Sequence, residues 1–185
     1  MRPNTAFHHL TDGWRMSMNG LTDFRKMKDE FFHYSDQSPL THEQKKAFKG
    51  LSYFPPNDDL RLEVTVEEFA EKQRIEMQTT SGDIQVYLRF GRIKFVVDDQ
   101  PAELTIYQDE NSWFLPFVDS LAGIETYPAG RYLEPELLGE GRFLVDFNLA
   151  YNPYCAYNDK WSCPLTPFEN RLKVPIRAGE KIFSV

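Results

Sequence analysis

The sequence predicts a mainly β fold, an antiparallel sandwich or partly open barrel of about eight to nine short strands with two N-terminal helices. The first observation behind this prediction is a two-residue periodicity, because hydrophobic and polar side chains alternate through much of residues 60–148. Turn-forming sequences such as Ser81-Gly82-Asp83 separate the alternating segments. Aromatic residues, at 15% of the chain, are the third observation, because large flat side chains favour strands.

One domain is expected over residues 1–185, because this length suffices to bury one core and no repeat or linker divides the chain. Within that domain we expect a loosely ordered N-terminal arm over residues 1–20, helices over 21–50 and the β domain over 60–185. Hydrophobic residues make up 41% and charged residues 26%, a composition typical of globular proteins.

Residues 21–34 are predicted to form an amphipathic helix. Apolar side chains recur there every three or four residues, which places them on one helix face. These are Leu21, Phe24, Met27, Phe31 and Tyr34. The charged residues between them are expected on the opposite, solvent-facing side: Arg25, Lys26, Lys28, Asp29 and Glu30.

A second, short helix is predicted to run from Thr41 to Phe48. Thr41 and Gln44 have the spacing of a capping box, in which each side chain accepts a hydrogen bond from the backbone N–H of the other residue. Gly50 is a typical C-terminal stop, because glycine adopts a positive φ without strain. The Pro-Pro-Asn-Asp sequence at residues 55–58 is expected to form a loop.

The first strands are expected between residues 60 and 97. Alternation marks four segments: Leu60–Val66, Ile75–Met77, Ile84–Phe90 and Ile93–Val97. Gly91-Arg92 separates the last two segments, which predicts a tight hairpin with Gly91 at the positive φ of a type II′ turn.

The same pattern predicts strands in the second half of the chain: Leu104–Ile106, Trp113–Phe117, Phe143–Asn148 and Leu172–Ile176. A strand at Arg131 is also expected, joined to the Asp146 strand by the turn-rich residues 134–141. Because successive side chains of a strand point to opposite faces, Asp146 and Asn148 should share one face and lie close together.

Charge limits the classes of partner. The net charge is −7, divided as +2 over residues 1–50, −11 over 51–140 and +2 over 141–185. An acidic chain without a basic stripe is not expected to bind nucleic acid or an anionic membrane. The slightly basic C-terminal part could favour an anionic small ligand, although a solvated surface explains +2 equally well.

Localisation is expected to be cytoplasmic, with reduced thiols. The N-terminal residues contain no continuous apolar stretch of the kind found in a secretion signal, and no segment of about 18 apolar residues could span a membrane. Proteins of the cytosol rarely keep disulfides, because the compartment is reducing. The sequence indicates neither a cofactor nor an oligomeric state.

The last quarter of the chain holds the candidate functional residues. Asp146 and Asn148 end a predicted strand and lead into the Tyr151-Asn152-Pro153 loop, a common position both for a site and for side chains that fix a loop. Glu169-Asn170 forms a second polar pair. Asp146 and Glu169 could act as an acid–base pair only if the fold brings them together.

Arg131 is predicted to bond to one of those two acids, Asp146 or Glu169. A guanidinium matches a carboxylate with two parallel hydrogen bonds, a geometry that lysine cannot reproduce. Arg131 stands on a segment next in sequence to the Asp146 strand, which makes such a contact feasible.

No tightly bound zinc or iron is expected. The two cysteines, Cys155 and Cys163, have seven residues between them, which is not the spacing of a zinc site. All histidines lie far from them in the sequence: His8, His9, His33 and His42. A weak Mg²⁺ or Ca²⁺ site with oxygen ligands at Asp146 and Glu169 stays open. Nucleotide-binding glycine loops and the serine-hydrolase elbow are absent from the sequence.

Three states are considered for Cys155 and Cys163. Free thiols are favoured by a reducing compartment. A disulfide would close a short loop whose ends are stiffened by Pro153 and Pro164. A reactive thiol is the third alternative and would need a base, for which His33 is the best placed histidine.

The chain resembles a bacterial and archaeal family known as domain of unknown function 1684. The similar sequences cover most of the chain after about residue 21: Ser38–Leu40, Phe48–Asn57, Gly130–Tyr132, Asp146–Asn158, Cys163–Leu172 and Ile176–Lys181. The family usually has a Phe-x-Asp-x-Thr-x-Gly element, to which Phe117, Asp119 and Gly123 correspond, whereas Leu121 replaces the hydroxyl residue. The resemblance implies no activity, cofactor or catalytic residue.

Two functions from different classes are therefore expected. The first is a small-molecule binding domain, for which enzymatic activity stays open, because pockets combine apolar walls with a few convergent polar groups. The alternative is a structural or protein-interaction module in which the same residues form a buried network. The candidate binding residues are Arg131, Tyr132, Asp146, Asn148, Tyr151, Asn152, Tyr157, Glu169 and Asn170.

Overall fold

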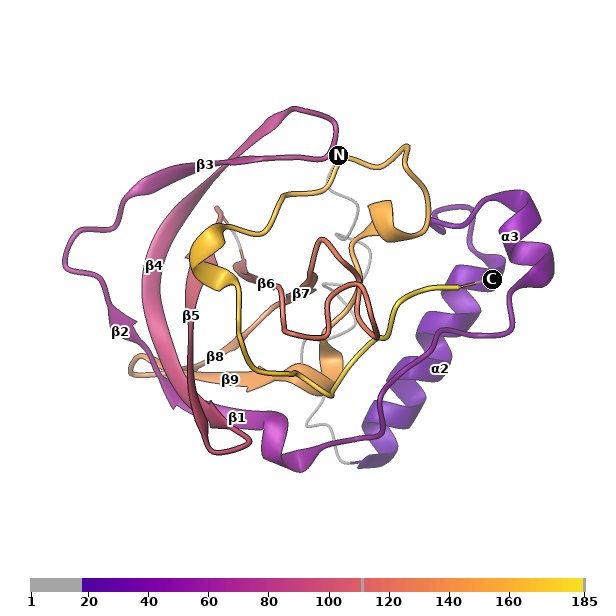
Figure 1. Cartoon of the computed structure of the whole chain (residues 1–185). Coiled ribbons are helices and arrows are strands. Elements are labelled where there is room, and N and C mark those ends of the chain that lie inside the picture. Colours follow the sequence, from indigo (N-terminus) through magenta and orange to yellow (C-terminus); the bar gives the residue numbers. More distant parts are fainter. Residues whose placement is uncertain (1–17, 111, 185) are drawn as a thin grey trace.

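The computed structural model describes residues 18–110 and 112–184 and confirms a mainly β fold (Figure 1). Within these residues, nine strands form two antiparallel sheets that do not close into a barrel, and two N-terminal helices pack beside them. Most of the expected N-terminal arm, residues 1–17, lies outside the described residues, and residues 18–20 belong to the first helix. In the described part of the chain, no helix is long and apolar enough to cross a membrane.

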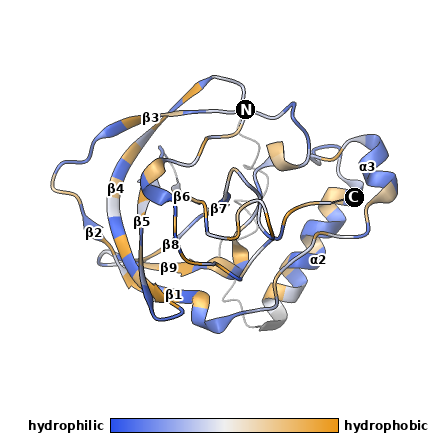
Figure 2. Ribbon diagram, in the orientation of Figure 1, coloured by the Kyte–Doolittle hydropathy of each residue, from blue (hydrophilic) through white to orange (hydrophobic). Residues whose placement is uncertain are grey.

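The two helices are α2 (Met18–Tyr34) and α3 (His42–Ala47). The predicted capping box at Thr41 is confirmed: the Thr41 N–H donates to Gln44 Oε1 at 2.8 Å, and the Gln44 N–H donates to Thr41 Oγ1 at 3.2 Å. Helix α3 buries no residue and is largely hydrophilic, so it caps the structure from outside (Figure 2).

The predicted orientation of α2 is wrong for two of its residues. Tyr34, expected in the apolar stripe, is 75% exposed, whereas Lys28, expected in solvent, is only 6% exposed. Leu21 is buried as predicted, and Lys28 and Phe32 complete the buried inward face. The physical reason is an ion pair, since Lys28 reaches a buried carboxylate, Glu180, in the C-terminal segment.

The larger sheet is built around one long strand, β4 (Ile84–Val97). One edge of β4 pairs first with β3 (Arg74–Gln78) and then with β2 (Glu67–Glu68), while its other edge pairs with β5 (Gln100–Gln108). Beyond β5 the sheet continues with β6 (Trp113–Phe117) and β7 (Arg131–Leu133). The curved β4 and β5 form the wall on the left of Figure 1.

The predicted hairpin at Gly91-Arg92 is wrong, because β4 runs through both residues. Its register against β5 shifts between Arg89 and Gly91, which marks a β-bulge. Glycine is needed there for space, since a Cβ on Gly91 would lie 2.5 Å from Val66 Cγ1. Alternating hydrophobicity on both sides of a glycine is therefore compatible with one bent strand.

The turn that reverses the chain lies further on, at Asp98-Asp99, between β4 and β5. Both aspartates have positive φ, 50° and 61°. Such a pair is typical of a type I′ hairpin turn, whose twist matches that of the flanking strands.

The smaller sheet contains β1 (Arg61–Thr65), β9 (Arg142–Asp146) and β8 (Glu136–Gly139), in that order. Strand β8 falls inside residues 134–141, which were expected to be rich in turns and for which no strand was predicted. Its side chains Leu137 and Leu138 are exposed, so no burial pattern indicates a strand.

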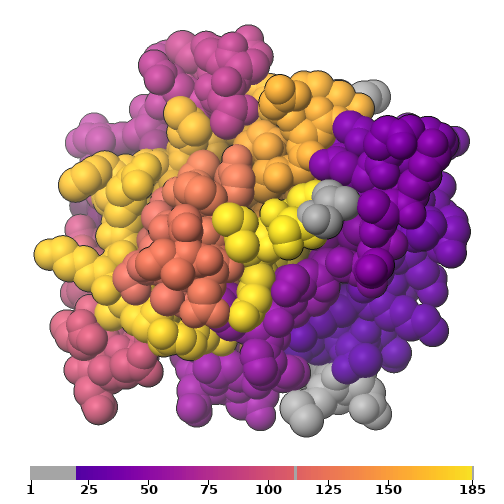
Figure 3. Space-filling view, turned by 45° about the vertical axis from the view of Figure 1, so that its right-hand side comes forward, coloured from indigo at the N-terminus to yellow at the C-terminus, as the bar shows by residue number. Residues whose placement is uncertain are grey.

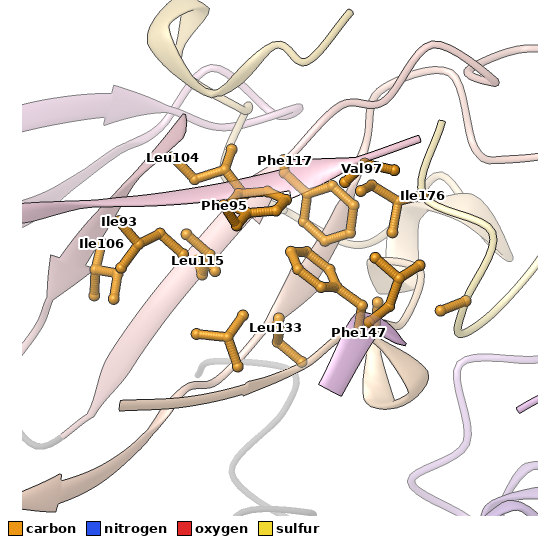
Figure 4. Packing of buried hydrophobic residues seen from close by; sticks show 14 of the residues in the cluster. Ile93, Phe95, Val97, Leu104, Ile106, Leu115, Phe117, Leu133, Phe147 and Ile176 are labelled. Atoms are coloured by element: carbon orange, nitrogen blue, oxygen red, sulfur yellow. The ribbon is translucent and has the colours of Figure 1, made fainter. Parts of the chain in front are cut away.

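The hydrophobic core lies between the two sheets and contains most of the large buried side chains (Figure 4). Phe147 packs against Phe95 and Phe117, with ring centroids 5.5 and 5.3 Å apart. Figure 4 shows Ile176 at the same core, although it comes from the far C-terminal end of the chain.

The strand predicted at Leu172–Ile176 is wrong, because no regular strand forms in the C-terminal segment, residues 171–184. The alternation itself is real, since Val174 and Ile176 are 2% and 0% exposed. The segment crosses the molecule and ends beside α2 (Figure 1). In Figure 3 it fills the surface between residues near 125 and the N-terminal helices, where the Ile182 N–H donates to the carbonyl of Glu125.

Candidate functional site

The nine predicted binding residues do not line one common site. Hydrogen bonds divide them into separate groups, most of which hold loops in place.

Arg131 is the anchor of the C-terminal segment. Its side chain is completely buried and donates to the carbonyls of Ile176, Ala178 and Glu180 at 2.8, 2.5 and 2.9 Å. It also pairs with the Asp119 carboxylate at 2.8 Å. Burial lowers the pKa of this guanidinium, and the neighbouring Asp119 opposes that shift.

The predicted partner of Arg131, Asp146 or Glu169, is therefore wrong. Residue 131 pairs with Phe117 across β6 and β7, so Asp119, two residues beyond the end of β6, lies next to it. A sequence cannot reveal this neighbour without the strand register.

Asp146 and Asn148 are neighbours, as predicted, but for a different reason. Strand β9 ends at Asp146, whose Oδ1 accepts the Asn148 N–H at 3.0 Å and so caps a 3-10 helix, Phe147–Leu149. The Asn148 side chain bonds to the same oxygen at 2.9 Å and to the Asn57 backbone carbonyl at 2.8 Å. Arg61 lies 3.4 Å from the other Asp146 oxygen. These contacts fix the entry of the chain into the small sheet.

Glu169 lies in a 3-10 helix, Phe168–Asn170, and belongs to another group, because its partners Arg89 and Tyr107 come from strands β4 and β5 of the larger sheet. Arg89 holds its carboxylate with both Nε, at 2.9 Å, and Nη2, at 2.6 Å, and the Tyr107 hydroxyl donates at 2.5 Å. The hydrogen bond from Arg89 lowers the pKa of Glu169, and the one from Tyr107 acts in the same direction. Asp146 and Glu169 thus have different partners on different sheets, which leaves the predicted acid–base pair without support.

Asn170 and Tyr132 also bond to the backbone. Asn170 is completely buried, accepts the Thr105 N–H at 2.8 Å and donates to the carbonyls of Thr105 and Pro116. Tyr132 donates to the carbonyl of Pro164, and burial raises its pKa. Tyr151, the ring next to Tyr132, donates to Glu134 at 2.9 Å.

The remaining two predicted residues, Asn152 and Tyr157, meet at a buried carboxylate. Glu180, which is 1% exposed, accepts the Asn152 N–H at 2.8 Å and the Tyr157 hydroxyl at 2.6 Å. Its other oxygen lies 2.5 Å from the Lys28 ammonium, which also lies 5.0 Å from the centre of the Tyr151 ring. The group around this carboxylate is called here the Glu180 cluster and contains Arg25, Lys28, Tyr53, Asn152, Tyr154, Tyr157 and Glu180.

Arg25 is the most unusual member of the Glu180 cluster. Its Nη1 donates to the carbonyl of Phe54 at 3.1 Å, and its guanidinium stacks 4.4 Å from the centre of the Tyr53 ring. Its Nε and Nη2 are buried and have no hydrogen-bond partner in the described part of the chain. Burial lowers the pKa of Arg25, and the Tyr53 and Glu180 oxygens oppose that shift.

Three further buried atoms of the cluster are also unpartnered among the described residues: the hydroxyls of Tyr53 and Tyr154 and the side-chain oxygen of Asn152. Burial raises the pKa of both tyrosines, and the Glu180 charge raises it further. Buried polar groups are nearly always bonded, so unpartnered atoms gathered around one carboxylate mark a candidate binding site.

Five residues of the Glu180 cluster are not among the residues predicted from the sequence: Arg25, Lys28, Tyr53, Tyr154 and Glu180. A signal for the first two exists, since Leu21, Arg25, Lys28 and Phe32 recur every three or four residues and so share one helix face. No comparable signal marks Tyr53, Tyr154 or Glu180.

Both cysteines are free thiols, in agreement with the favoured alternative, and Cys163 is the more buried of the two. In the described residues no group of three or more histidine, cysteine, aspartate or glutamate side chains could hold a metal ion. The expectation of no tightly bound zinc or iron stays a prediction.

Comparison with known proteins supports the resemblance found in the sequence. Residues 46–181 match the family described as protein of unknown function (DUF1684). The fold is similar to the solution NMR structure of an uncharacterized protein of Haloarcula marismortui, with a TM-score of 0.68 and 36% identity over 89% of this chain and 93% of that one. A search of curated proteins found no significant match. The chain therefore belongs to the DUF1684 family.

Proposed function

We propose that the chain is a small-molecule binding domain and that the Glu180 cluster holds a carboxylate or phosphate group of the ligand. The observation that carries this proposal is a pair of buried N–H groups on Arg25, Nε and Nη2, which have no hydrogen-bond partner among residues 18–110 and 112–184. These two atoms form one edge of the guanidinium, which matches two oxygens of an anion.

In the same protein, Arg89 uses the corresponding guanidinium edge to bind a carboxylate. Its Nε and Nη2 donate to the two oxygens of Glu169, at a site where both side chains are partly exposed. Arg25 presents the same edge in a buried position, where an unpartnered donor costs roughly 1–3 kcal/mol and more when it is charged. An anionic ligand would remove that cost on binding.

The surrounding side chains favour a ligand with further polar groups. The hydroxyls of Tyr53 and Tyr154 could donate to it, and the Asn152 oxygen could accept from it. Lys28 is already paired with Glu180, so this ion pair would position the site rather than neutralise the ligand. The phenyl ring of Tyr53, stacked on Arg25, holds the guanidinium plane in place.

Thermal-shift screening would test the proposal, with a panel of mono-, di- and tricarboxylates, amino acids and phosphate monoesters, and with acetate and inorganic phosphate as simple anions. A ligand at about 100 times its dissociation constant should raise Tm by roughly 5–10 °C. Carboxylate and phosphate hits would distinguish the two anion classes.

Arg25→Lys keeps the charge but removes the two-atom edge, so it should abolish the shift in Tm whatever its effect on the Tm of the free protein. Arg142→Lys is the matched control, because the Arg142 side chain is 52% exposed, and it should keep the full shift. No hit in the whole panel, or an equal shift in Arg25→Lys, would contradict the proposal.

A structural or interaction module is the second candidate, and a specific observation favours it. Three of the predicted binding residues donate mainly to backbone carbonyls: Arg131, Asn148 and Asn170. Side chains with such partners typically fix loops in place. If this second candidate is right, no compound of the thermal-shift panel should raise Tm, and variants of these residues should change only the stability of the fold.

A further inference from the structure

The two cysteines lie side by side, although neither belongs to the Glu180 cluster. The Cys155 N–H donates to Cys163 Sγ at 3.3 Å, and the Tyr127 hydroxyl lies 3.9 Å from Cys155 Sγ. Cys163 is 1% exposed, whereas Cys155 is partly open to solvent. One sulfur is therefore accessible and the other lies directly behind it.

The turn between β3 and β4 holds the buried sulfur in position. The Thr80 N–H donates to the Cys163 carbonyl at 2.9 Å, and the Cys163 N–H donates to Thr80 Oγ1 at 3.1 Å. Next to them, the Ser162 hydroxyl donates to Thr79 Oγ1 at 2.8 Å. Cys163 is thus fixed by a neighbouring turn, while Cys155 sits on a single turn of 3-10 helix, Tyr154–Ala156.

The pKa values of the two thiols are shifted in opposite directions. A hydrogen bond from the Cys163 thiol lowers the pKa of Cys155 to about 7, and the Tyr127 hydroxyl acts in the same direction against the effect of burial. The same contact with Cys155 raises the pKa of Cys163, and burial raises it further. The accessible sulfur is therefore the one that ionises near neutral pH, and the thiolate is the reactive form of cysteine.

We propose that Cys155 and Cys163 form a redox-active dithiol that reacts with a low-molecular-weight disulfide such as oxidised glutathione. Cys155 would be the attacking sulfur, because it is accessible, and Cys163 would be the resolving sulfur, because it lies against Cys155 but away from solvent.

The reaction would proceed by two exchanges. The Cys155 thiolate attacks one sulfur of the small disulfide, a mixed disulfide forms, and the other sulfur leaves as a thiolate that takes up a proton. Cys163 then loses its proton to solvent and attacks the Cys155 sulfur, which releases the second small thiol. In total the protein dithiol is oxidised to one disulfide, and the small disulfide is reduced to two thiols.

Incubation of the full chain with oxidised glutathione, followed by acid quenching, alkylation and mass spectrometry, would test the proposal. The wild-type protein should lose two hydrogen atoms and retain no glutathione. Cys163→Ser should accumulate a glutathione adduct on Cys155, and Cys155→Ser should accumulate none. A wild-type protein that stays a dithiol, or that keeps glutathione, would overturn the proposal.

A second measurement does not depend on whether the cysteine variants fold. The rate of alkylation of Cys155 by iodoacetamide in the wild-type protein should rise with pH around a midpoint near 7. Tyr127→Phe should move that midpoint upward, because it removes a hydrogen bond to the thiolate. A midpoint near the value of an ordinary cysteine, about 8.5, would overturn the assignment of Cys155 as the attacking sulfur.

Discussion

The Arg131 side chain gives the C-terminal segment, residues 171–184, the hydrogen bonds that a neighbouring strand would otherwise provide. It donates to the carbonyls of residues 176, 178 and 180, which would otherwise need backbone N–H partners in a sheet. A backbone carbonyl buried without a partner is costly, so the guanidinium replaces a ladder of hydrogen bonds with one side chain.

Arg131→Lys is therefore expected to lower the free energy of unfolding by about 2–4 kcal/mol, because an ammonium cannot reach Asp119 and three carbonyls at once. Urea unfolding followed by tryptophan fluorescence would measure the change. Arg142→Lys, at an exposed site, should stay within about 0.5 kcal/mol of the wild type. Equal midpoints for the two variants would contradict the role of Arg131 as an anchor.

Glu169 should make the stability depend on pH in the acid range. Arg89 lowers its pKa in the folded state, so its contribution is complete above the unfolded pKa of about 4.3 and is lost as the pH falls through the lower folded value. Glu169→Gln should flatten the fall of unfolding free energy between about pH 5 and pH 3. Glu136→Gln, at an exposed position of β8, is the control. A curve for Glu169→Gln as steep as the wild-type curve would refute this prediction.

At the scale of elements, α2 differs from an ordinary amphipathic helix because its inward face is partly charged. Lys28 is buried at the ion pair with Glu180, and its ammonium also lies over the rings of Phe32 and Tyr151. Two charges leave water at this contact, so the pair is tolerated only while both partners are present. The helix and the C-terminal segment should therefore be coupled through it.

Lys28→Met should lower the free energy of unfolding by about 3–5 kcal/mol, because it leaves the Glu180 carboxylate buried without its cation. Combining Lys28→Met with Glu180→Gln should recover at least about 2 kcal/mol of that loss, since no uncompensated charge remains. The exposed pair of Lys94 and Glu67 is the matched control, and Lys94→Met should cost at most about 1 kcal/mol. Denaturant unfolding of the wild type, Lys28→Met, the double variant and Lys94→Met would measure these changes. If Lys28→Met lowers the free energy of unfolding no more than Lys94→Met does, the coupling between the helix and the C-terminal segment is ruled out.

For the whole molecule, the periodicity of the sequence predicted the fold class, the two helices and most strands, because burial on one face imposes a repeat of two or of three to four residues. The prediction failed where the same hydrophobic periodicity is compatible with two different structures. Gly91 could mark a turn or a bulge, and the alternation in Leu172–Ile176 fits both a strand and an extended segment bonded to Arg131.

The candidate site was less predictable because its parts are distant in the sequence. Asn152 and Tyr157 were found through the density of polar residues near them. Arg25 and Lys28 were assigned to solvent, since charged residues on a helix usually face water. Only the packing of α2 against the C-terminal segment turns them toward Glu180.

The central claim is that Arg25 offers an anion a buried edge that has no partner among the residues the structure describes. NMR of the arginine Nε–Hε groups of the full chain, during titration with a panel hit, tests it most directly. We predict that the Arg25 Hε signal moves downfield as it gains a charge-assisted hydrogen bond, whereas the Arg89 signal, already bonded to Glu169, stays in place. Saturating binding that leaves the Arg25 signal unmoved would contradict the claim.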